Sequence, residues 1–292
     1  MYGSNINGNH ITTKKLKSVL FSNEKVIVHC HRNNEIMRML FYRFLGAKFT
    51  LVATRHAEAK PSGLTLFLLK KADKVVTLIT STSKNLGIEN TKIGHGVQVD
   101  KFVPESTKRL LNISQENIIL NAGRVRKEKG QLVLLEAVKN LKKHPTWALV
   151  IVGKVDKPEF LNDLKSIAKK HQIESQVYFI NETRDIVSYY QAAKIVVAPS
   201  FSEGFSLVTA EAMSCENTVI ATQNVGVHSE LINHGKNGYL FEAGNENQLE
   251  DILFKLIEQK IPYLGKEARK EIINNWSAKK EAKSLTEFYL KN

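Results

Sequence analysis

Short apolar runs alternate with segments of helical periodicity along most of this chain of 292 residues. Short runs rich in β-branched residues fit buried strands, and apolar residues at every third or fourth position fit helices packed on one face. Strands that alternate with helices predict an α/β fold of parallel sheets flanked by helices. The expected strands cover residues 26–29, 49–54, 75–79, 118–120, 147–152, 177–180, 195–198 and 219–221, and the expected helices cover residues 34–45, 64–71, 131–141, 160–171, 186–193, 208–214 and 278–290.

Composition limits the class of protein and its partners. The chain has 42 Lys and Arg against 29 Asp and Glu, an excess that suits nucleic acid, anionic lipid or a phosphorylated substrate. It has no zinc-finger, recognition-helix or RNA-binding signature, so no nucleic-acid partner is expected. Cys30 and Cys215 lie far apart, which favours a reducing cytosol. No segment reaches the roughly 18 apolar residues of a membrane span, and a soluble or peripheral protein is expected.

The run from Ser200 to Ala212 holds two glutamates, Glu203 and Glu211, eight positions apart. An apolar run precedes it, and the residues from Leu207 onward fit the start of a helix. The first amides of a helix are unpaired, so a strand, a polar turn and a helix start together form an anion-binding site. Carboxylates accept hydrogen bonds from hydroxyls, so the expected ligand carries phosphates and hydroxyls, as a nucleotide-sugar does. The alternative is a surface loop followed by an ordinary helix with two solvated acids.

A basic loop with glycines at both ends lies between another expected strand and helix. Gly123 permits a tight turn, Arg124 offers a planar fork for phosphate oxygens, and Lys129 offers a mobile charge. The alternative is a solvated basic loop, which fits Arg126 and Lys127 better than it fits Arg124 and Lys129.

Both segments resemble one known family. The stretch from Glu203 to Glu211 resembles the Glu-x7-Glu motif of retaining glycosyltransferases of family 4, the glycosyl transferases group 1, which have the GT-B fold. The loop from Gly123 to Gly130 resembles the Gly-Arg…Lys-Gly signature of the same family. The resemblance implies two Rossmann-like domains facing a cleft. The first strand expected here is similar to the family's His-x-His strand rather than to its opening strand, so a shortened N-terminal domain is expected.

The resemblance also implies roles for single residues. In the family, the first glutamate contacts the donor sugar, the second holds the ribose, and the arginine and lysine bind the diphosphate and stabilise the departing nucleotide. The implied catalytic residues are His56, Glu203, Arg124 and Lys129, and the implied donor-binding residues are Gly123, Arg124, Lys129, Glu203, Gly204, Phe205, Ser206, Leu207 and Glu211.

Histidines near the ends of two N-terminal strands resemble family positions as well. His56 resembles the histidine of a Thr-x-His strand end, which faces the donor sugar, with a structural or exposed histidine as the alternative. His29 and His31 resemble the His-x-His strand end near the acceptor, and they lack the neighbouring ligands that a metal site needs. Lys60 fits an acceptor loop or a plain surface turn. The expected acceptor-side residues are His29, His31, Arg32, Asn33 and Lys60.

The expected domains follow from the same comparison. Residues 1–108 would form the short acceptor-side domain, and residues 109–275 the nucleotide-sugar-binding domain. The junction falls in the polar stretch of residues 100–115. Residues 276–292 would form a C-terminal helix that crosses back to the N-terminal domain.

The function implied is transfer of a hexose from GDP-mannose or a UDP-sugar to a cell-surface glycan. The acceptor would be lipopolysaccharide core or capsule on the cytoplasmic membrane face, because some segments resemble lipopolysaccharide core mannosyltransferases and basic proteins are drawn to anionic lipid. The family resemblance and the absence of an Asp-x-Asp motif imply no metal or other cofactor. The alternatives are a non-catalytic nucleotide- or glycan-binding GT-B protein, a nucleotide-sugar epimerase and a nucleic-acid binder.

Overall fold

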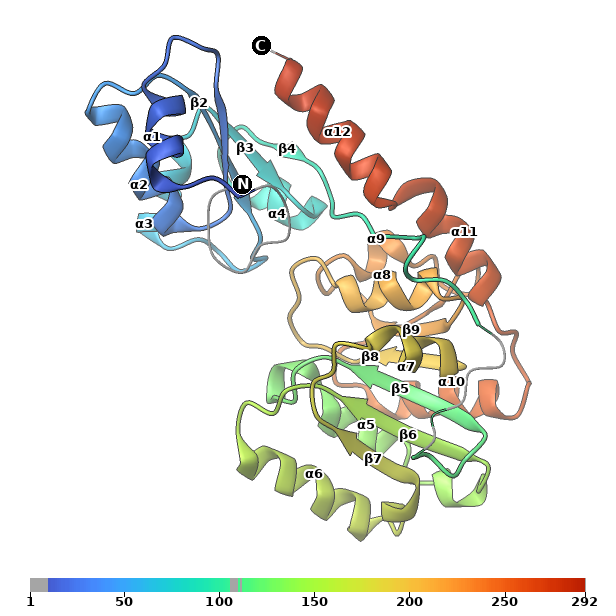
Figure 1. Cartoon of the computed structure of the whole chain (residues 1–292). Helices are drawn as coiled ribbons and strands as arrows, with labels where there is room; N and C mark the ends of the chain where they lie inside the picture. The colour runs from blue at the N-terminus through green and yellow to red at the C-terminus, as the bar shows by residue number, and fades with distance from the viewer. Residues whose placement is uncertain (1–9, 106–109, 111, 292) are drawn as a thin grey trace. The chain divides into compact units, whose positions relative to one another are not determined.

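The computed structural model describes residues 10–105, 110 and 112–291. The chain divides into two compact units, Met1–Gly94 with Leu285–Asn292, and His95–Ser284. Each unit contains one parallel sheet with helices packed on it (Figure 1). The expected domain boundary between residues 108 and 109 lies outside the described residues.

The first unit is built on a four-stranded parallel sheet of order β1-β2-β3-β4. Cys30 aligns with Ala53, and Arg55 with Thr77, so the strands end at the same edge. The strands are β1 (Ile27–Cys30), β2 (Thr50–Arg55), β3 (Lys74–Thr77) and β4 (Thr91–Lys92), and the helices are α1 (Thr13–Leu20), α2 (Asn33–Phe44), α3 (Gly63–Lys70) and α4 (Thr80–Asn85).

Both faces of this sheet are covered. Alternate residues of a strand point to opposite faces. Leu51 of β2 belongs to a core cluster with residues of α1, α2 and α3, and Val52 belongs to a second cluster. That second cluster also contains Leu285 and Phe288 of α12 (Ala278–Leu290). The last turns of the C-terminal helix therefore complete the core of the first unit.

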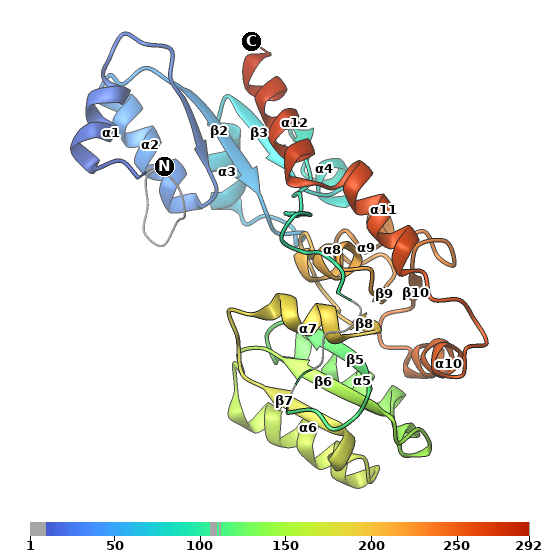
Figure 2. The ribbon, with the colours of Figure 1, turned by 45° about the vertical axis from the view of Figure 1, so that its right-hand side comes forward.

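The second unit has a six-stranded parallel sheet of order β10-β9-β8-β5-β6-β7. The strand order changes direction between β5 and β8, and ligands of such sheets bind at that switch point, beyond the carboxyl ends of the strands. The views in Figures 1 and 2 show the strands of this sheet with helices against them. The strands are β5 (Asn117–Ala122), β6 (Trp147–Val152), β7 (Val177–Ile180), β8 (Ile195–Ala198), β9 (Thr218–Thr222) and β10 (Tyr239–Phe241). The helices are α5 (Gln131–Ala137), α6 (Pro158–Lys170), α7 (Ile186–Ala192), α8 (Leu207–Ser214), α9 (His228–Leu231), α10 (Glu246–Ile257) and α11 (Gly265–Asn275), with 3-10 turns at Lys127–Lys129, Leu141–Lys143 and Glu174–Gln176.

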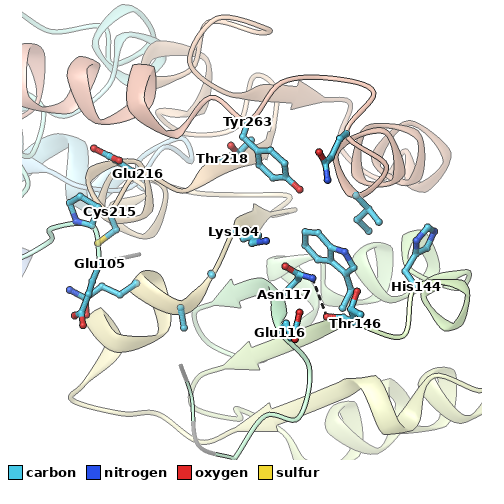
Figure 3. Close-up of a pocket in the computed structure, with 17 residues that line it drawn as sticks. Glu105, Glu116, Asn117, His144, Thr146, Lys194, Cys215, Glu216, Thr218 and Tyr263 are labelled. Atoms are coloured by element: carbon cyan, nitrogen blue, oxygen red, sulfur yellow. Dashed lines mark hydrogen bonds between the residues drawn. The ribbon is translucent and has the colours of Figure 1, made fainter. Parts of the chain in front are cut away.

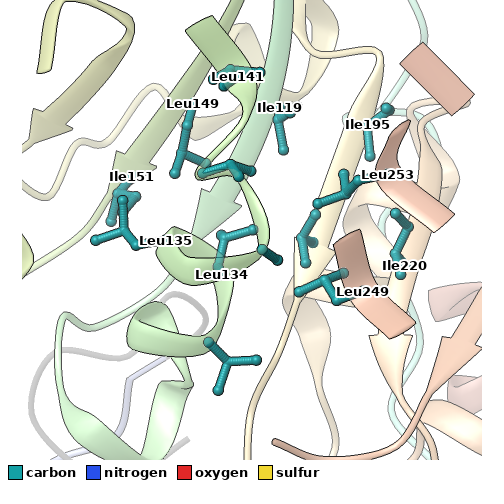
Figure 4. Close-up of a cluster of buried hydrophobic side chains, with 14 of the residues drawn as sticks. Ile119, Leu134, Leu135, Leu141, Leu149, Ile151, Ile195, Ile220, Leu249 and Leu253 are labelled. Carbon is teal, nitrogen blue, oxygen red and sulfur yellow. The ribbon is translucent and has the colours of Figure 1, made fainter. Parts of the chain in front are cut away.

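The core of the second unit lies between its sheet and the helices α5 and α10. Figure 4 shows Leu134 of α5 and Leu253 of α10 beside strand residues such as Ile119 and Ile195, and all four are fully buried. Burying one such side chain stabilises the fold by roughly 1.5–3 kcal/mol. This core gives the loops at the carboxyl ends of β5 and β8 a firm base.

The alternation of strands and helices confirms the predicted α/β class, and one helix was predicted too long. Helix α5 ends at Ala137, whereas apolar spacing predicted a helix to residue 141. The chain tightens after Ala137 into turns with bonds between residues three apart, such as the Leu141 amide to the Val138 carbonyl. Leu141 is fully buried in that turn. The apolar spacing therefore predicted its burial correctly but predicted a helix that is too long.

Candidate functional site

The two predicted motif loops follow the neighbouring strands β5 and β8. We call residues 123–130 the Arg124 loop and residues 199–206 the Glu203 loop. The Phe201 amide donates to the Glu128 carbonyl at 2.9 Å, which ties one loop to the other. Gly130 has φ +70°, and a Cβ there would lie 1.9 Å from the Pro199 carbonyl oxygen. Only glycine fits this contact without displacing the backbone.

Lys129 and Glu203 form an ion pair between the two loops. The Lys129 Nζ lies 2.6 Å from Glu203 Oε1, and the two side chains are only 19% and 13% exposed. The Ser200 hydroxyl donates to the same carboxylate oxygen at 2.7 Å. Because the pair is largely withdrawn from solvent, salt screens it less than it screens a surface pair. The structure thus joins the two predicted motifs in one charged cluster.

Two buried amide side chains hold the Arg124 loop, and sequence analysis did not single them out. Gln131 Nε2 donates to the Arg124 carbonyl at 3.0 Å and to Asn121 Oδ1 at 3.3 Å. Asn121 Nδ2 in turn donates to the Val197 carbonyl of β8 at 2.9 Å. Arg124 itself has an exposed side chain on this supported backbone. Asn121 follows the expected strand of residues 118–120 and Gln131 begins the expected helix, so apolar spacing gave no signal for either residue.

Close backbone packing also fixes Gly123, at the start of the Arg124 loop. Gly123 has φ +133°, a conformation that glycine adopts more readily than other residues. A Cβ on Gly153 would lie 1.8 Å from the Gly123 carbonyl oxygen, so the loop that follows β6 presses against this turn.

Glu211 lies within helix α8 and contacts a buried tyrosine. Tyr190 of α7 is fully buried, and its hydroxyl donates to Glu211 Oε2 at 3.2 Å. Burial raises the pKa of Glu211 above its usual range, while the Tyr190 hydrogen bond and the Lys101 charge oppose that rise. Burial also raises the pKa of Tyr190, and the Glu211 charge adds to this effect. Further hydroxyl donors would stabilise the ionised form of such a partly buried carboxylate.

The residues between Glu203 and Glu211 form the end of the Glu203 loop and the start of helix α8. The Phe205 ring lies 5.5 Å from the His95 ring and 5.6 Å from the Trp276 ring, measured between centroids. Ser206 is buried, and its hydroxyl lies 3.0 Å from the Thr209 hydroxyl. Leu207 begins α8 and is exposed. The Phe205 and Ser206 side chains therefore support the loop, and the first amides of the helix are the groups suited to an anion.

Gly204 is held from the other side by a second glycine. Gly226 has φ +53°, and a Cβ there would lie 2.5 Å from the Gly204 carbonyl oxygen and 2.6 Å from Glu203 Cβ. The turn before α9 thus packs directly on the Glu203 loop.

His228 is a buried histidine beside the ion pair, and its segment had no predicted chemical role. Its Nδ1 lies 3.0 Å from the Thr222 carbonyl oxygen, so this nitrogen carries the proton and donates. Nε2 is buried with no hydrogen-bond partner among the residues that the structure describes. Burial lowers the pKa of His228, the Glu203 charge raises it and the Lys129 charge lowers it. A neutral imidazole with a bare acceptor nitrogen thus lies near the two charged groups.

The first unit gathers three predicted histidines at the carboxyl ends of β1 and β2. His31 Nδ1 lies 3.0 Å from His56 Nε2, and the His29 and His31 rings stack with centroids 4.6 Å apart. His29 also contacts Tyr289 Oη and Thr54 Oγ1, each at 2.5 Å. A hydrogen bond between two imidazoles needs one donor and one acceptor nitrogen, so His31 and His56 cannot both be doubly protonated in this contact.

The remaining acceptor-side residues lie close to this cluster in the sequence and differ in role. Arg32 is the N-cap of α2, and its amide donates to Glu35 Oε2 at 3.2 Å. Asn33 Nδ2 donates to Thr65 Oγ1 of α3 at 2.9 Å, which fits a structural role. Lys60 is exposed in the turn before α3.

A large cavity of the second unit lies at the opposite end of its strands. It measures about 1090 Å³ and is lined by the first residues of three strands, Asn117, Trp147 and Thr218. Figure 3 shows Asn117 and Thr146 joined there by a hydrogen bond of 3.4 Å. The motif residues lie at the carboxyl ends of the strands, so cavity size does not identify the candidate site in this unit.

Neither a metal-binding cluster nor a membrane-spanning helix occurs among the residues that the structure describes. No cluster of three or more His, Cys, Asp or Glu side chains in that part of the chain is arranged to hold a metal ion. No helix formed by those residues is both long and apolar enough to cross a bilayer. The expectation that no metal is needed stays a prediction.

The chain is similar in sequence to known glycosyltransferases. A family model described as "Glycosyl transferases group 1" matches residues 102–279. The lipopolysaccharide core biosynthesis mannosyltransferase LpsB of Rhizobium meliloti (strain 1021) is 26% identical over 275 residues, which cover 89% of this chain and 78% of that protein. LpcC of Rhizobium leguminosarum bv. viciae, which has the same description, is 27% identical over 273 residues, covering 89% of this chain and 77% of that protein.

A solved structure supports the fold. The Anabaena protein Alr3699/HepE in complex with UDP superposes with a TM-score of 0.84 at 20% identity, covering 94% of this chain and 81% of that one. This likeness confirms the predicted GT-B architecture of two Rossmann-like sheets.

Proposed function

Because this chain belongs to the glycosyl transferases group 1 family, we propose that it is a retaining, metal-independent hexosyltransferase of cell-surface glycan assembly. The donor is GDP-mannose or a UDP-sugar, and the acceptor is a lipopolysaccharide core or capsule glycan. The names of LpsB and LpcC support a lipopolysaccharide core acceptor and a mannosyl donor. The UDP complex of the Anabaena protein supports a nucleotide donor.

The contact between Lys129 and Glu203 carries this proposal. It brings a cation suited to phosphate and a carboxylate suited to sugar hydroxyls within 2.6 Å of each other. The pair lies at the carboxyl edge of a parallel sheet, where such folds bind ligands. A lysine ammonium has three donor hydrogens, so Lys129 can hold Glu203 and a phosphate oxygen at once. Few ligands other than nucleotide-sugars present a diphosphate and sugar hydroxyls side by side.

The proposed mechanism assigns one task to each group. Arg124 and Lys129 bind the diphosphate and stabilise the charge that grows on it as the bond to the sugar breaks. Glu203 accepts hydrogen bonds from the sugar hydroxyls, and Glu211 accepts them from the ribose. The acceptor oxygen bonds to the anomeric carbon on the face that the phosphate leaves, and the departing phosphate oxygen takes the acceptor proton. This route retains the configuration and needs no carboxylate nucleophile.

Residues of the first unit serve the sugar and the acceptor in this proposal. His56 hydrogen-bonds the donor sugar near the reacting carbon, and its contact with His31 at 3.0 Å holds its ring. His29, His31, Arg32, Asn33 and Lys60 form the acceptor side, although Asn33 already bonds Thr65. Cationic residues here suit an anionic acceptor. The enzyme would work in the cytoplasm, on the inner face of the cytoplasmic membrane.

The first experiment is calorimetric titration of the purified chain with UDP, GDP, ADP and their common sugar conjugates. Selective binding of one nucleotide identifies the donor class. Arg124→Ala and Glu211→Ala should each weaken that binding by about tenfold or more. Arg126→Ala is the matched control, because Arg126 lies in the same loop but faces Glu128 at 3.8 Å and Asp156 at 4.0 Å. Binding of no nucleotide would overturn the proposal.

A second experiment tests the reaction itself. The chain is incubated with the selected donor and lipopolysaccharide core acceptors, with and without EDTA, and the anomeric configuration of the product is determined by NMR. A retained configuration and unchanged activity in EDTA are expected. An inverted product or a strict metal requirement would contradict the mechanism. Nucleotide binding without transfer to any acceptor would favour a non-catalytic binding protein, and donor turnover without acceptor an epimerase.

A further inference from the structure

Two helices of the first unit expose large apolar side chains on their outer surfaces. The exposed fractions of these six residues run from 51% to 86%. The inner sides of the same helices bury Ile36, Met39 and Leu68 in the core, so both helices are apolar on two sides. We call the outer residues the apolar face: Met37, Phe41, Phe44 and Leu45 of α2 and its C-cap, and Leu64 and Phe67 of α3.

These residues lie on two helices that pack side by side. Positions 37, 41, 44 and 45 recur at three- and four-residue spacing, which aligns them along one stripe of α2. Helices α2 and α3 pack together, and the Asn33–Thr65 hydrogen bond of 2.9 Å joins them. Both views show α2 and α3 on the same side of strands β1 to β3 (Figures 1 and 2). An exposed apolar patch of this kind marks an interaction surface.

The sequence around the apolar face is strongly basic. Residues 1–94 contain 15 Lys and Arg against 5 Asp and Glu, so they hold ten of the 13 net positive charges of the whole chain. Exposed lysines border the two helices at Lys48, Lys60, Lys70 and Lys71. A partner that meets this side of the unit therefore meets both apolar and cationic groups.

Two nearby acids already bond to groups of the first unit. Asp73 pairs with Arg43 at 2.6 Å and accepts from the Leu51 amide at 2.7 Å. Glu35 accepts from the amides of His31 and Arg32 at the start of α2. These carboxylates are committed to bonds within the unit, so they offset little of the outward positive charge.

Lys71 already has the geometry of a lysine at a membrane–water interface. The Lys71 Nζ lies 5.7 Å from the centre of the exposed Phe67 ring. A lysine can lay its apolar stem along an apolar surface while its ammonium stays in the polar layer. An anionic bilayer offers both layers, since its headgroups attract cations and its acyl boundary accepts apolar side chains.

We propose that the apolar face and its bordering lysines dock the first unit on an anionic lipid bilayer. Phe41, Phe44 and Phe67 enter the boundary between headgroups and acyl chains, and Lys70 and Lys71 contact the lipid phosphates. This inference rests on the proposed function only in placing the enzyme beside a membrane-linked glycan. Docking needs neither a donor nor transfer, so the two proposals can fail separately.

The test is sedimentation of the full chain with phosphatidylcholine vesicles that contain either no anionic lipid or about 30% phosphatidylglycerol. Binding to the anionic vesicles alone is expected, and it should weaken at least about tenfold when salt rises from about 0.1 M to about 1 M. Phe41→Ser with Phe44→Ser should reduce the partition coefficient at least about tenfold. Urea unfolding of this variant beside the wild type checks that it stays folded.

Matched variants distinguish binding through the apolar face from effects of total charge or of exposed apolar residues elsewhere in the chain. Lys70→Glu with Lys71→Glu should abolish binding, whereas Lys169→Glu with Lys170→Glu, an equal charge change at exposed positions of α6, should retain most of it. Leu290→Ser removes a side chain that is 75% exposed near the end of α12, and it should leave binding unchanged.

Three results would overturn the proposal. Equal binding to neutral and anionic vesicles would show that the lysines do not contribute to docking. Undiminished binding of the phenylalanine variant would remove the role of the apolar face. A concentration-dependent dimer in sedimentation velocity that Phe44→Ser dissociates, without vesicle binding, would make the face an interface between copies. If nucleotide binding is absent but vesicle docking behaves as expected, only the proposed function fails.

Discussion

The Lys129 ammonium lies 2.6 Å from Glu203 Oε1, although the two residues are 74 positions apart in the chain. The contact unites one residue from each predicted motif, and the Ser200 hydroxyl adds a third group to the cluster. Removing one member leaves the other as a largely buried charge without its partner, which is more costly than the loss of a surface ion pair.

The two members of this pair should respond differently to substitution. Lys129→Met is expected to destabilise the fold by about 1–3 kcal/mol and to weaken binding of the free nucleoside diphosphate about tenfold or more. Glu203→Gln should leave binding of the free diphosphate within about threefold and remove the extra affinity of the sugar conjugate, because its carboxylate serves the sugar. Urea unfolding and calorimetry with both ligands measure these effects.

Arg126→Met is the control for the lysine variant, because it removes a charge from the same loop away from Glu203. A Glu203→Gln protein that still prefers the sugar conjugate over the free diphosphate would contradict the assigned role of this carboxylate.

Glu211→Gln should stabilise the free protein while it weakens nucleotide binding. Burial raises the pKa of Glu211, so between its unfolded value near 4.5 and its folded value the native state binds more protons than the unfolded state. Stability therefore falls as pH rises through that interval, and at neutral pH the ionised carboxylate costs free energy. The glutamine removes this cost and keeps an oxygen for Tyr190, and a gain of about 1 kcal/mol is expected.

Urea unfolding of both proteins at several pH values measures the difference. The variant should gain on the wild type as pH rises from about 4.5, and the gain should level off once Glu211 is ionised in the native state. A variant that is less stable than the wild type at neutral pH would show that the Glu211 charge already stabilises the free protein.

The sequence predicted much of this arrangement because its signals are local. Alternating apolar and helical patterns located the strands of both sheets except the short edge strands β4 and β10, since burial on a parallel sheet imposes that pattern on each buried segment. The polar loops after β5 and β8 lie at one edge because all strands of a parallel sheet end on the same side. The meeting of Lys129 with Glu203 follows from the adjacency of these two strands.

What the sequence did not predict depends on contacts between distant segments. Nothing near Tyr190 in the chain indicates that its hydroxyl meets Glu211 of the next helix. Gln131 and Asn121 looked like ordinary polar residues until the structure showed them buried and bonded to the loop backbone. The apolar stripe of α2 was assigned to a helix by its period, but the period does not reveal that both sides of the helix are apolar.

We expect the protein to lose stability in mild acid because His228 is buried. Burial lowers its pKa below the unfolded value near 6.5, so below that pH the unfolded state binds a proton that the native state excludes. The contribution is complete above about pH 6.5 and is lost as pH falls toward the folded pKa. His228→Gln should flatten the pH dependence of unfolding in that interval. Unfolding free energies measured from pH 7.5 to pH 5, as about six points, test this.

The wild type measured in parallel supplies the reference for that comparison. If His228→Gln keeps the pH dependence of the wild type, the acid sensitivity does not come from the buried imidazole.

Two glycines with nearly equal backbone angles test how closely the motif loops must approach. Gly130 has φ +70° and Gly235 has φ +73°, but a Cβ on Gly130 would lie 1.9 Å from the Pro199 oxygen, whereas nothing lies within 4 Å of one on Gly235. Gly235→Ala should therefore cost only the backbone strain, about 1 kcal/mol. Gly130→Ala should cost at least about 2 kcal/mol more, because the loops must separate. Moving Lys129 away from Glu203 should also weaken nucleotide binding in Gly130→Ala alone. Thermal unfolding and calorimetry compare the two variants. Equal losses of stability in both would mean that the contact between the loops can accommodate a methyl group.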